Sequence, residues 1–538
     1  MTANFDFIIV GAGTAGCTLA RRLIDTQQVT VALIEAGKKD TNPFIHMPIG
    51  VAALSSITGI NWNYNTTPQP TLNERQLFWP RGKVMGGSSS INAMVYIRGQ
   101  YSDYDEWEAM GAKGWSADEV LPLFKLSEDN TRGTNPFHGV GGPIGVSDLR
   151  YHDPSSDAFV AAAQHVQLPQ VDDFNTHERL GLGIYQVFHR DGQRCSTAKG
   201  FIGPVLSHPN LTVLTHTHVR KVLIEGGEAK GVECEINGEI LTYTANREVI
   251  LSGGAINSPQ LLMLSGIGDK SHLAEHMIEC VADIPAVGQH MQDHLDVVVQ
   301  VKAKSACGYA VMPRLLPKYI SHGIQYLTQK KGLLTSNAAE AGGFAASRYG
   351  SAEKPDLQFH FIPGLIVDHG RQLAFDYGFS LHVCHLYPTS TGSIRLASKS
   401  PQDAPNIDPN YLSDEADLYA LVDGVRLARQ IFTAPEFTHY GLSPWYPIAS
   451  SLDEELSDEA IIDFIRERAE TVYHPVGTCR MGSVDDPNTV VDPDCRVKYV
   501  TRLRVVDASV MPKIMGGNTN APTIMIAEKI AANIIAEL

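Results

Sequence analysis

No apolar run in the chain approaches the roughly 18 residues that a membrane-spanning helix requires, although 43% of its 538 residues are hydrophobic. The N-terminus also lacks the basic region, long apolar run and small-residue cleavage site of a signal peptide, because Met1-Thr2-Ala3-Asn4 leads directly into an apolar stretch. We therefore expect a cytoplasmic protein. Any membrane contact would be peripheral, for example at the inner face of the cell membrane.

Cysteine and positive charge are both scarce. The 8 cysteines are scattered, without a C-x-x-C pair or the dense framework of a secreted disulfide domain, so we expect reduced thiols and no metal site. The formal net charge is -16, and no long Lys/Arg run reverses it locally. A chain of this charge repels phosphate backbones, so we expect no nucleic-acid partner.

The length of the chain implies more than one core. At 538 residues it is too long for one ordinary domain, so we expect two large domains, or one with big insertions. A charged content of 19% beside the 43% hydrophobic content is that of a folded globular protein and argues against disorder.

The N-terminal pattern predicts a strand, a helix and a second strand. Residues 5–10 form an apolar run that ends at Gly11, residues 17–24 continue with helical spacing, and residues 29–34 form the next run. Both runs are nearly all apolar rather than alternating, as in strands buried on both faces of a parallel sheet. Similar runs at 247–251 and 503–506 predict that separated segments complete one α/β domain.

The pattern changes between residues 301 and 470. Pro-containing turns recur there, and polar alternation appears at 356–361 and 380–385. These features predict the sheet of a second domain. No internal repeat or low-complexity segment is evident in the sequence.

The turn after the first strand carries a G-x-G-x-x-G pattern. It runs from Gly11 through Gly13 to Gly16, opens a helix, and has Glu35 at the end of the next strand about 20 residues on. The glycines let the backbone turn tightly and approach a pyrophosphate, and the helix N-terminus attracts the anion. A glycine triplet alone is often only a turn, but this context predicts dinucleotide binding. Glu35 should accept hydrogen bonds from an adenosine ribose, which disfavours NADP without separating NAD from FAD.

Three further segments hold polar groups suited to a ligand or to catalysis. Residues 81–92 pack glycines, hydroxyls and an amide into one loop, which could equally be a surface turn. Residues 471–478 place His474 in an apolar setting, and residues 516–522 place the Asn518 carboxamide just before a helix. A lone histidine is more often a satisfied core residue, so these residues alone leave the catalytic interpretation open.

Together these segments resemble the motifs of the glucose-methanol-choline (GMC) oxidoreductases. Residues 81–92 resemble the first family signature and residues 253–262 the second, and with the N- and C-terminal motifs the resemblance spans nearly the whole chain. It implies an α/β fold, with a Rossmann-type FAD-binding domain and a discontinuous substrate-binding domain on a mostly antiparallel sheet. We assign residues 1–155, 195–300 and 471–538 to the first domain, and residues 156–194 and 301–470 to the second.

The resemblance implies FAD as the cofactor. Its adenine would lie near Glu35 and Val219, and its isoalloxazine near the first signature. Some family members attach the flavin through a His two residues after the serine that corresponds to Ser89; Ile91 stands there, so we expect non-covalent FAD. The residues expected to contact FAD are Gly11, Gly13, Thr14, Ala15, Gly16, Glu35, Ala36, Arg81, Val84, Gly86, Gly87, Ser88, Asn92, Ala93, Met94, Val95, Val219, Ser252, Gly253, Tyr473, His474, Asp507, Ala508, Asn518, Thr519 and Asn520.

The position of His474 holds the catalytic base in the family pattern. An imidazole, with an unperturbed pKa of about 6.5, can take the hydroxyl proton of an alcohol near neutral pH. The resemblance gives Asn518 the role of holding the substrate oxygen while hydride passes to flavin N5. Asn at this position is typical of the choline-dehydrogenase-like branch. A helix predicted at 522–535, capped by Asn520 or Ala521, would direct its positive end toward the flavin.

The expected reaction is oxidation of an alcohol to its aldehyde, with electrons passed to a quinone or another acceptor. An oxidase that uses oxygen is the nearest alternative, and the sequence does not decide between them. A lyase of the same fold, in which the flavin is structural, is an alternative of a different class.

Two features bear on the substrate. Segments 41–48 and 336–344 resemble the alcohol dehydrogenases of bacterial alkane degradation, which implies a primary aliphatic alcohol of medium chain length. Choline is the alternative, because Glu340 could pair with a quaternary ammonium if it faced the cavity. Residues 312–334 mix apolar side chains with Arg314, Lys318, Lys330 and Lys331. They predict either a helix with a solvated basic edge or a lid or membrane-surface patch that admits apolar alcohols and a lipid-dissolved quinone.

Overall fold

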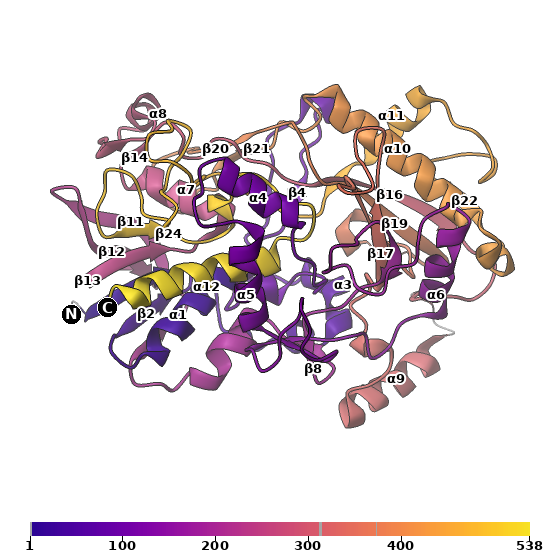
Figure 1. The fold of residues 1–538 in the computed structure, drawn as a ribbon, viewed down its shortest axis with the longest axis horizontal. Coiled ribbons are helices and arrows are strands. Elements are labelled where there is room, and N and C mark those ends of the chain that lie inside the picture. The colour runs from indigo at the N-terminus through magenta and orange to yellow at the C-terminus, as the bar shows by residue number, and fades with distance from the viewer. Residues whose placement is uncertain (1–2, 311, 313–314, 373) are drawn as a thin grey trace.

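The computed structural model describes residues 3–310, 312, 315–372 and 374–538, and Arg314, named above, lies outside them. Two seven-stranded sheets dominate the described part of the chain. They lie at opposite ends of the molecule in Figure 1, and the first strand begins and the last helix ends beside the first sheet.

The parallel part of the first sheet consists of the apolar runs expected from the sequence. Strands β10 (Leu211–Leu214), β2 (Val31–Ile34), β1 (Ala3–Val10) and β13 (Glu239–Leu251) follow one another in parallel, and β24 (Leu503–Val505) pairs with the end of β13. Every residue of β2 is buried, as expected for a strand covered on both faces. The sheet continues antiparallel through β12 (Glu228–Ile236) and β11 (His218–Glu225), which the apolar pattern did not predict.

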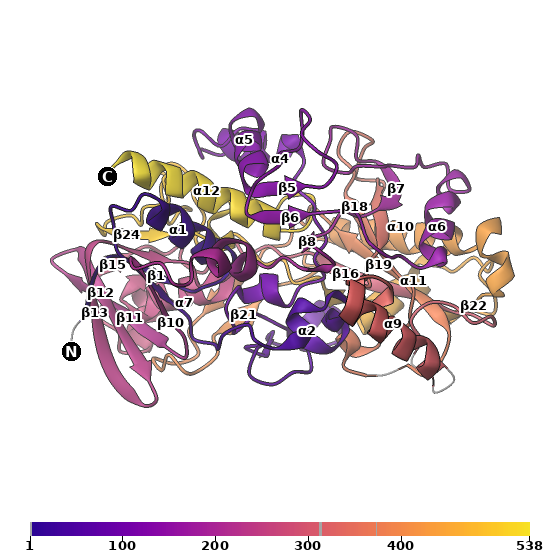
Figure 2. The same ribbon diagram turned by 90° about the horizontal axis from the view of Figure 1, so that it is seen from below.

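Helix α1 (Thr14–Asp25) packs on β1 and β2, and α12 (Asn520–Ala536) packs on α1, as both figures of the fold show (Figures 1 and 2). Arg22 donates to both oxygens of the Glu528 carboxylate at 2.7 Å, which joins the two helices. The predicted C-terminal helix is therefore present. Its start differs from the prediction, because Thr519 is the capping residue and Asn520 is already helical.

The second sheet is antiparallel at every pairing, as predicted. Its strands are β22 (Ser443–Tyr446), β16 (Leu295–Lys302), β19 (Gly378–His385), β18 (Leu357–Ile362), β17 (Ala341–Ala345) and β7 (Gly181–Ile184) in spatial order, with β23 (Glu470–Thr471) beside β16. Strand β16 crosses the domain boundary predicted at residue 300. Residue 300 therefore lies inside a strand of this sheet that starts at Leu295.

The two faces of the second sheet have different roles. Helix α10 (Glu415–Phe432) covers one face, where Phe361 of β18 lies against Phe432. The side chains of His360 and Ile362 alternate with Phe361 and line a cavity on the other face. Strand alternation thus places Phe361 under the helix, and His360 and Ile362 toward the cavity.

The other described helices are α2 (Pro43–His46), α3 (Val51–Leu54), α4 (Tyr101–Ala109), α5 (Ala117–Ser127), α6 (Pro154–Ala161), α7 (Gly254–Leu264), α8 (Lys270–Glu275), α9 (Leu316–Gln329) and α11 (Asp458–Arg468). Short strand pairs are β3 (Tyr64–Asn65) with β4 (Phe78–Trp79), β5 (Glu128–Asn130) with β6 (Ile144–Val146), β8 (His189–Arg190) with β9 (Gln193–Arg194), β14 (Ile267–Gly268) with β15 (Ala282–Asp283), and β20 (Ser393–Arg395) with β21 (Asn406–Asp408). Within the described residues, no helix is both long and apolar enough to span a bilayer.

Candidate active site

A cavity of about 690 Å³ is lined by loops of the first sheet and by the polar face of the second. All the residues predicted to contact the cofactor line it except Gly16, Val84 and Gly86. These three lie behind the lining residues: Val84 is fully buried in a small apolar cluster, and Gly86 donates its N–H to the Ala12 carbonyl at 2.7 Å. Their contribution is to support the loops.

Two glycine-rich loops meet at one wall of the cavity. A Cβ on Gly16 would lie 1.9 Å from the Gly11 carbonyl oxygen, so only glycine lets α1 start this close to β1. Gly87, at φ +51°, approaches the first loop so closely that a Cβ there would lie 2.8 Å from the Gly13 Cα. The first signature is thus packed directly against the dinucleotide-binding loop.

Glu35 directly follows β2 and lies at the cavity wall. Its two carboxylate oxygens accept the N–H groups of Ala12, at 3.0 Å, and Gly37, at 2.8 Å. Burial raises the pKa of this carboxyl to about 7, although the two N–H groups oppose the rise. Further lone pairs remain for a ribose hydroxyl. Trp62, His218 and Val219 line the cavity as well; Trp62 and His218 were not predicted, because no pattern marks them.

Asp507 ties the second signature to the last strand of the sheet. The carboxylate accepts the Gly254 N–H at 2.8 Å and the Ser258 hydroxyl at 2.5 Å, both from the start of α7. It also accepts the Ser509 N–H at 2.8 Å. Thr14 donates its hydroxyl to the Asn520 carboxamide at 2.8 Å, so the first turns of α1 and α12 are joined at the same cavity.

His474 is fixed through its backbone. Its N–H donates to Asp293 at 2.6 Å, and Arg81 donates to the Tyr473 carbonyl at 2.6 Å. Tyr473 has φ +67°, a left-handed conformation that a non-glycine residue adopts only when its surroundings hold it there. Asp293 also accepts the Thr471 hydroxyl at 2.5 Å. These contacts direct the His474 side chain into the cavity.

The side chains of His474 and Asn518, the two residues predicted to be catalytic, lie next to each other. The Asn518 Nδ2 and the His474 Nε2 are 3.4 Å apart, and both residues line the cavity. Gln358 of β18 donates to the Asn518 Oδ1 at 3.2 Å, which turns the Asn518 amino group toward His474. Gln358 was not predicted, because only the register of the second sheet brings it here.

The environment of His474 favours a neutral imidazole. Burial lowers its pKa well below the usual 6.5, and the neighbouring His294, His360 and Arg81 lower it further. The pKa of His360 is also lowered, to about 3, mainly by burial. A neutral imidazole is the form that can accept a proton.

Glu340 does not face the cavity, contrary to the condition set for pairing with a quaternary ammonium. It is fully buried and is absent from the cavity wall. One carboxylate oxygen accepts the hydroxyls of Ser336 and Tyr309, and the other accepts the Ser156 hydroxyl at 2.7 Å and the Asp153 N–H at 2.8 Å. Four donors satisfy this carboxylate, so its role is structural.

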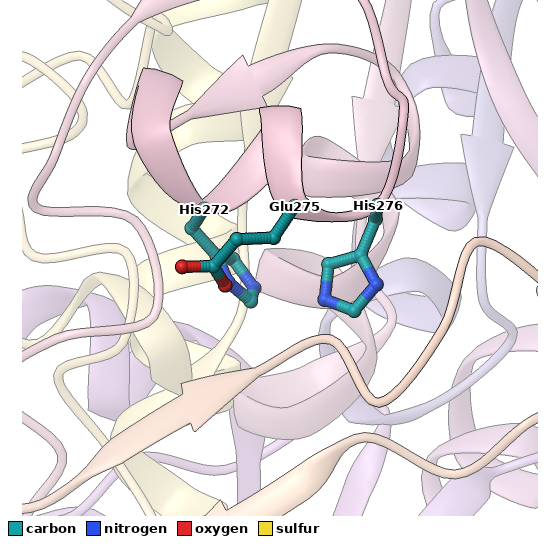
Figure 3. A group of neighbouring side chains, drawn as sticks. All are labelled: His272, Glu275 and His276. Carbon is teal, nitrogen blue, oxygen red and sulfur yellow. The ribbon is translucent and has the colours of Figure 1, made fainter.

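One group of possible metal ligands lies outside the cavity, in α8 and just after it (Figure 3). It consists of His272, Glu275 and His276. The His272 Nε2 accepts the Leu396 N–H at 3.0 Å, so the neutral ring carries its proton on Nδ1, beside Glu275 at 3.2 Å. A metal would have to displace that proton. The hydrogen bonds explain His272 without a metal, and the absence of a metal site stays a prediction.

The residues of the cavity fit FAD. The cavity extends from Glu35 to His474, and the N-termini of α1 and α12 both reach it, as an anionic pyrophosphate and a flavin require. Its volume lies in the range of cofactor sites. A Cβ on Gly13 would meet only the Gly87 Cα, at 3.9 Å, so the backbone of this turn is open to a ligand.

Comparison with known proteins gives a consistent result. Two family models, both described as GMC oxidoreductase, match residues 5–296 and 388–527. The chain is 47% identical to an alcohol dehydrogenase (acceptor) of Pseudomonas putida, over 99% of this chain and 96% of the relative. It is 42% identical to the mitochondrial choline dehydrogenase of Homo sapiens, over 99% and 90% of the two chains.

A solved structure shares the fold as well. The crystal structure of pyridoxine 4-oxidase from Mesorbium loti superposes with a TM-score of 0.87 at 31% identity, over 99% of each chain. Because the family models match most of the chain and the relatives align over nearly all of it, the chain belongs to the GMC oxidoreductase family.

Proposed function

We propose that this FAD-dependent alcohol dehydrogenase oxidises a primary aliphatic alcohol of medium chain length to its aldehyde and passes the electrons to a quinone or another acceptor. The observation that carries the proposal is the convergence of the His474 Nε2 and the Asn518 Nδ2, 3.4 Å apart, at the wall of the cavity. A base and a hydrogen-bond donor at this spacing can share one substrate oxygen.

The protein residues prepare the alcohol for hydride loss. His474, held neutral by its surroundings, takes the hydroxyl proton. Asn518 donates to the oxygen and orients the carbinol carbon, and Gln358 holds the Asn518 carboxamide in place. FAD, when bound, supplies the hydride acceptor. An amide orients but cannot take a proton, so His474 is the base of this pair.

Apolar side chains in the cavity wall support an aliphatic substrate. They include Val95, Leu333, Ile362, Ile366 and Val472. The relative at 47% identity bears the name of an alcohol dehydrogenase. Choline is the second candidate, since Asp376 and Glu470 also line the cavity and the choline dehydrogenases are 42% identical. Burial raises the pKa of Glu470 to about 7, which weakens its negative charge near neutral pH.

Steady-state kinetics with alcohols from butanol to dodecanol, and with choline, test the substrate. Each methylene buried in a matching pocket adds at most roughly 0.8 kcal/mol, a factor of about four in kcat/KM. Efficiency should therefore climb with chain length before levelling off. A flat series with choline far ahead would overturn the aliphatic assignment.

The surface at α9 supports a lipid-dissolved acceptor. Leu316, Ile320, Ile324 and Leu327 recur on one face of this helix and are 56–75% exposed. No acidic residue occurs between 312 and 334 in a chain of net charge -16. Tyr319 of the same helix lines the cavity, so this surface adjoins the site. We place the enzyme in the cytoplasm, against the inner face of the membrane; its eight cysteines are all free, as in a reducing compartment.

A further inference from the structure

A second histidine lies directly behind His474. His294 immediately precedes β16, is fully buried, and does not line the cavity. Its Nδ1 is 3.0 Å from the Nδ1 of His474, and the two rings are nearly perpendicular, at 85°. His294 therefore contacts the base on the side away from the substrate. The hydrogen bonds of the pair determine where each ring carries its proton.

The other nitrogen of His294 fixes its own tautomer. The His294 Nε2 lies 3.0 Å from the Leu386 carbonyl oxygen, which can only accept a hydrogen bond. The Nε2 must therefore carry a proton. Burial also lowers the pKa of His294 to about 3, although hydrogen bonds to the Leu386 and Met515 carbonyl groups oppose the fall, so the ring is neutral. With its one proton on Nε2, the ring has a lone pair on Nδ1.

The tautomer of His474 follows from that of His294. A hydrogen bond between two nitrogens 3.0 Å apart requires a proton on one of them. The Nδ1 of His294 carries no proton, so it can only accept the hydrogen bond. The His474 Nδ1 is the donor. The His474 Nε2 is then unprotonated, and this is the atom that faces the Asn518 Nδ2.

We propose that His294 is a positioning residue that holds His474 in its Nδ1–H tautomer, so that Nε2 is the atom that takes the substrate proton. The chain of donors runs from His474 through His294 to the Leu386 carbonyl. When Nε2 gains the substrate proton, the Nδ1–H still donates to His294, so the ring keeps its orientation through the step. This inference rests on the proposed role of His474.

A matched pair of substitutions separates this role from packing. Asn and Leu have nearly the same shape, but only the Asn carboxamide places an acceptor oxygen near the position of the histidine Nδ1. His294→Asn should keep flavin reduction by alcohol within about tenfold of wild type. His294→Leu should lose roughly a further 10- to 100-fold in the limiting rate, part of what a general base contributes. KM and FAD content should change little in both variants.

The tautomer can also be observed without altering His294. In the ¹⁵N spectrum of protein labelled at histidine, the resonances lost in His474→Ala identify this ring. Wild-type His474 should show a pyrrole-type Nδ1 and a pyridine-type Nε2. In His294→Leu the two nitrogens should shift toward the average of the two tautomers.

Two results would overturn the inference. One is equal rates for His294→Asn and His294→Leu, and the other is a pyridine-type Nδ1 in wild-type His474. Both are distinguishable from failure of the proposed function. That failure would appear as normal flavin reduction in His474→Ala, whatever the tautomer.

Discussion

At the residue scale, the chemistry depends on the protonation of one buried imidazole. His474 has no carboxylate in contact with its ring; its described ring partners are His294 and Asn518. Asp293 accepts the backbone N–H instead. Such a ring resists protonation by bulk acid, yet it can accept a proton from an alcohol whose oxygen Asn518 stabilises. The site therefore combines a neutral base with an amide donor.

The lowered pKa of His474 predicts the pH dependence. The base is active only when it is unprotonated, and burial moves its pKa well below 6.5. The pH below which the rate falls should therefore also lie well below 6.5. The limiting rate of flavin bleaching by saturating alcohol should stay constant at neutral pH and fall only well below pH 6.5. Anaerobic stopped-flow measurements across this range provide the test. If the rate fell to half at pH 6.5 or above, burial would not control the pKa of His474.

The sequence identified His474 and Asn518 because each lies in a contiguous family motif. It could not identify His294, Gln358 or Asp293 as their partners. His294 is 180 residues from His474, and Gln358 is 160 residues from Asn518. Only the pairing of β16, β18 and β19 brings them together, and strand register is not encoded locally. The polar alternation at 356–361, which includes Gln358, was the one available signal.

At the scale of elements, α9 differs from α10, the helix that covers the second sheet. The sequence predicted a helix within 312–334, and the structure has one at Leu316–Gln329. Its apolar positions repeat every three or four residues, but Tyr326 is its only buried residue. Figure 1 shows α9 at the outer edge of the second sheet's end of the molecule. An amphipathic helix with an exposed apolar face and basic neighbours suits an anionic lipid surface.

Vesicle binding tests the role of α9. Replacing Ile320, Ile324 and Leu327 together by Ser should weaken binding to vesicles containing anionic lipid at least roughly tenfold, because three aliphatic side chains lose their lipid contact. The matched control replaces Ile240 and Met277, which are 50% and 79% exposed on the first domain. Equal binding by both variants and wild type would mean that the apolar face of α9 does not contact lipid.

At the scale of the whole molecule, two sheets of different design share one site. The parallel sheet supplies glycine loops and helix N-termini, and the antiparallel sheet supplies the side chains behind the base. The sequence predicted both sheets, because buried parallel strands and alternating antiparallel strands leave different patterns. It missed β11 and β12 as antiparallel neighbours of β13, and it put the domain boundary inside β16. Both depend on non-local pairing.

Cofactor attachment is a property of the whole holoenzyme. Ile91 lines the cavity at the position where a covalent link would need a histidine, and an aliphatic side chain cannot form that bond. The purified protein should be yellow and should release intact FAD on acid denaturation. The flavin absorbance of the supernatant, compared with that of the precipitated protein, measures how much FAD is released. Flavin that stays with the precipitate would contradict non-covalent binding.

The most direct measurement is anaerobic stopped-flow bleaching of the flavin by decanol in wild type and in His474→Ala. Bleaching should be rapid in wild type and slower by roughly 10²- to 10⁴-fold in the variant, the usual scale for a general base, with unchanged FAD content. Absence of bleaching by any alcohol in wild type would favour the lyase of the same fold. A variant that bleaches near the wild-type rate would contradict His474 as the base.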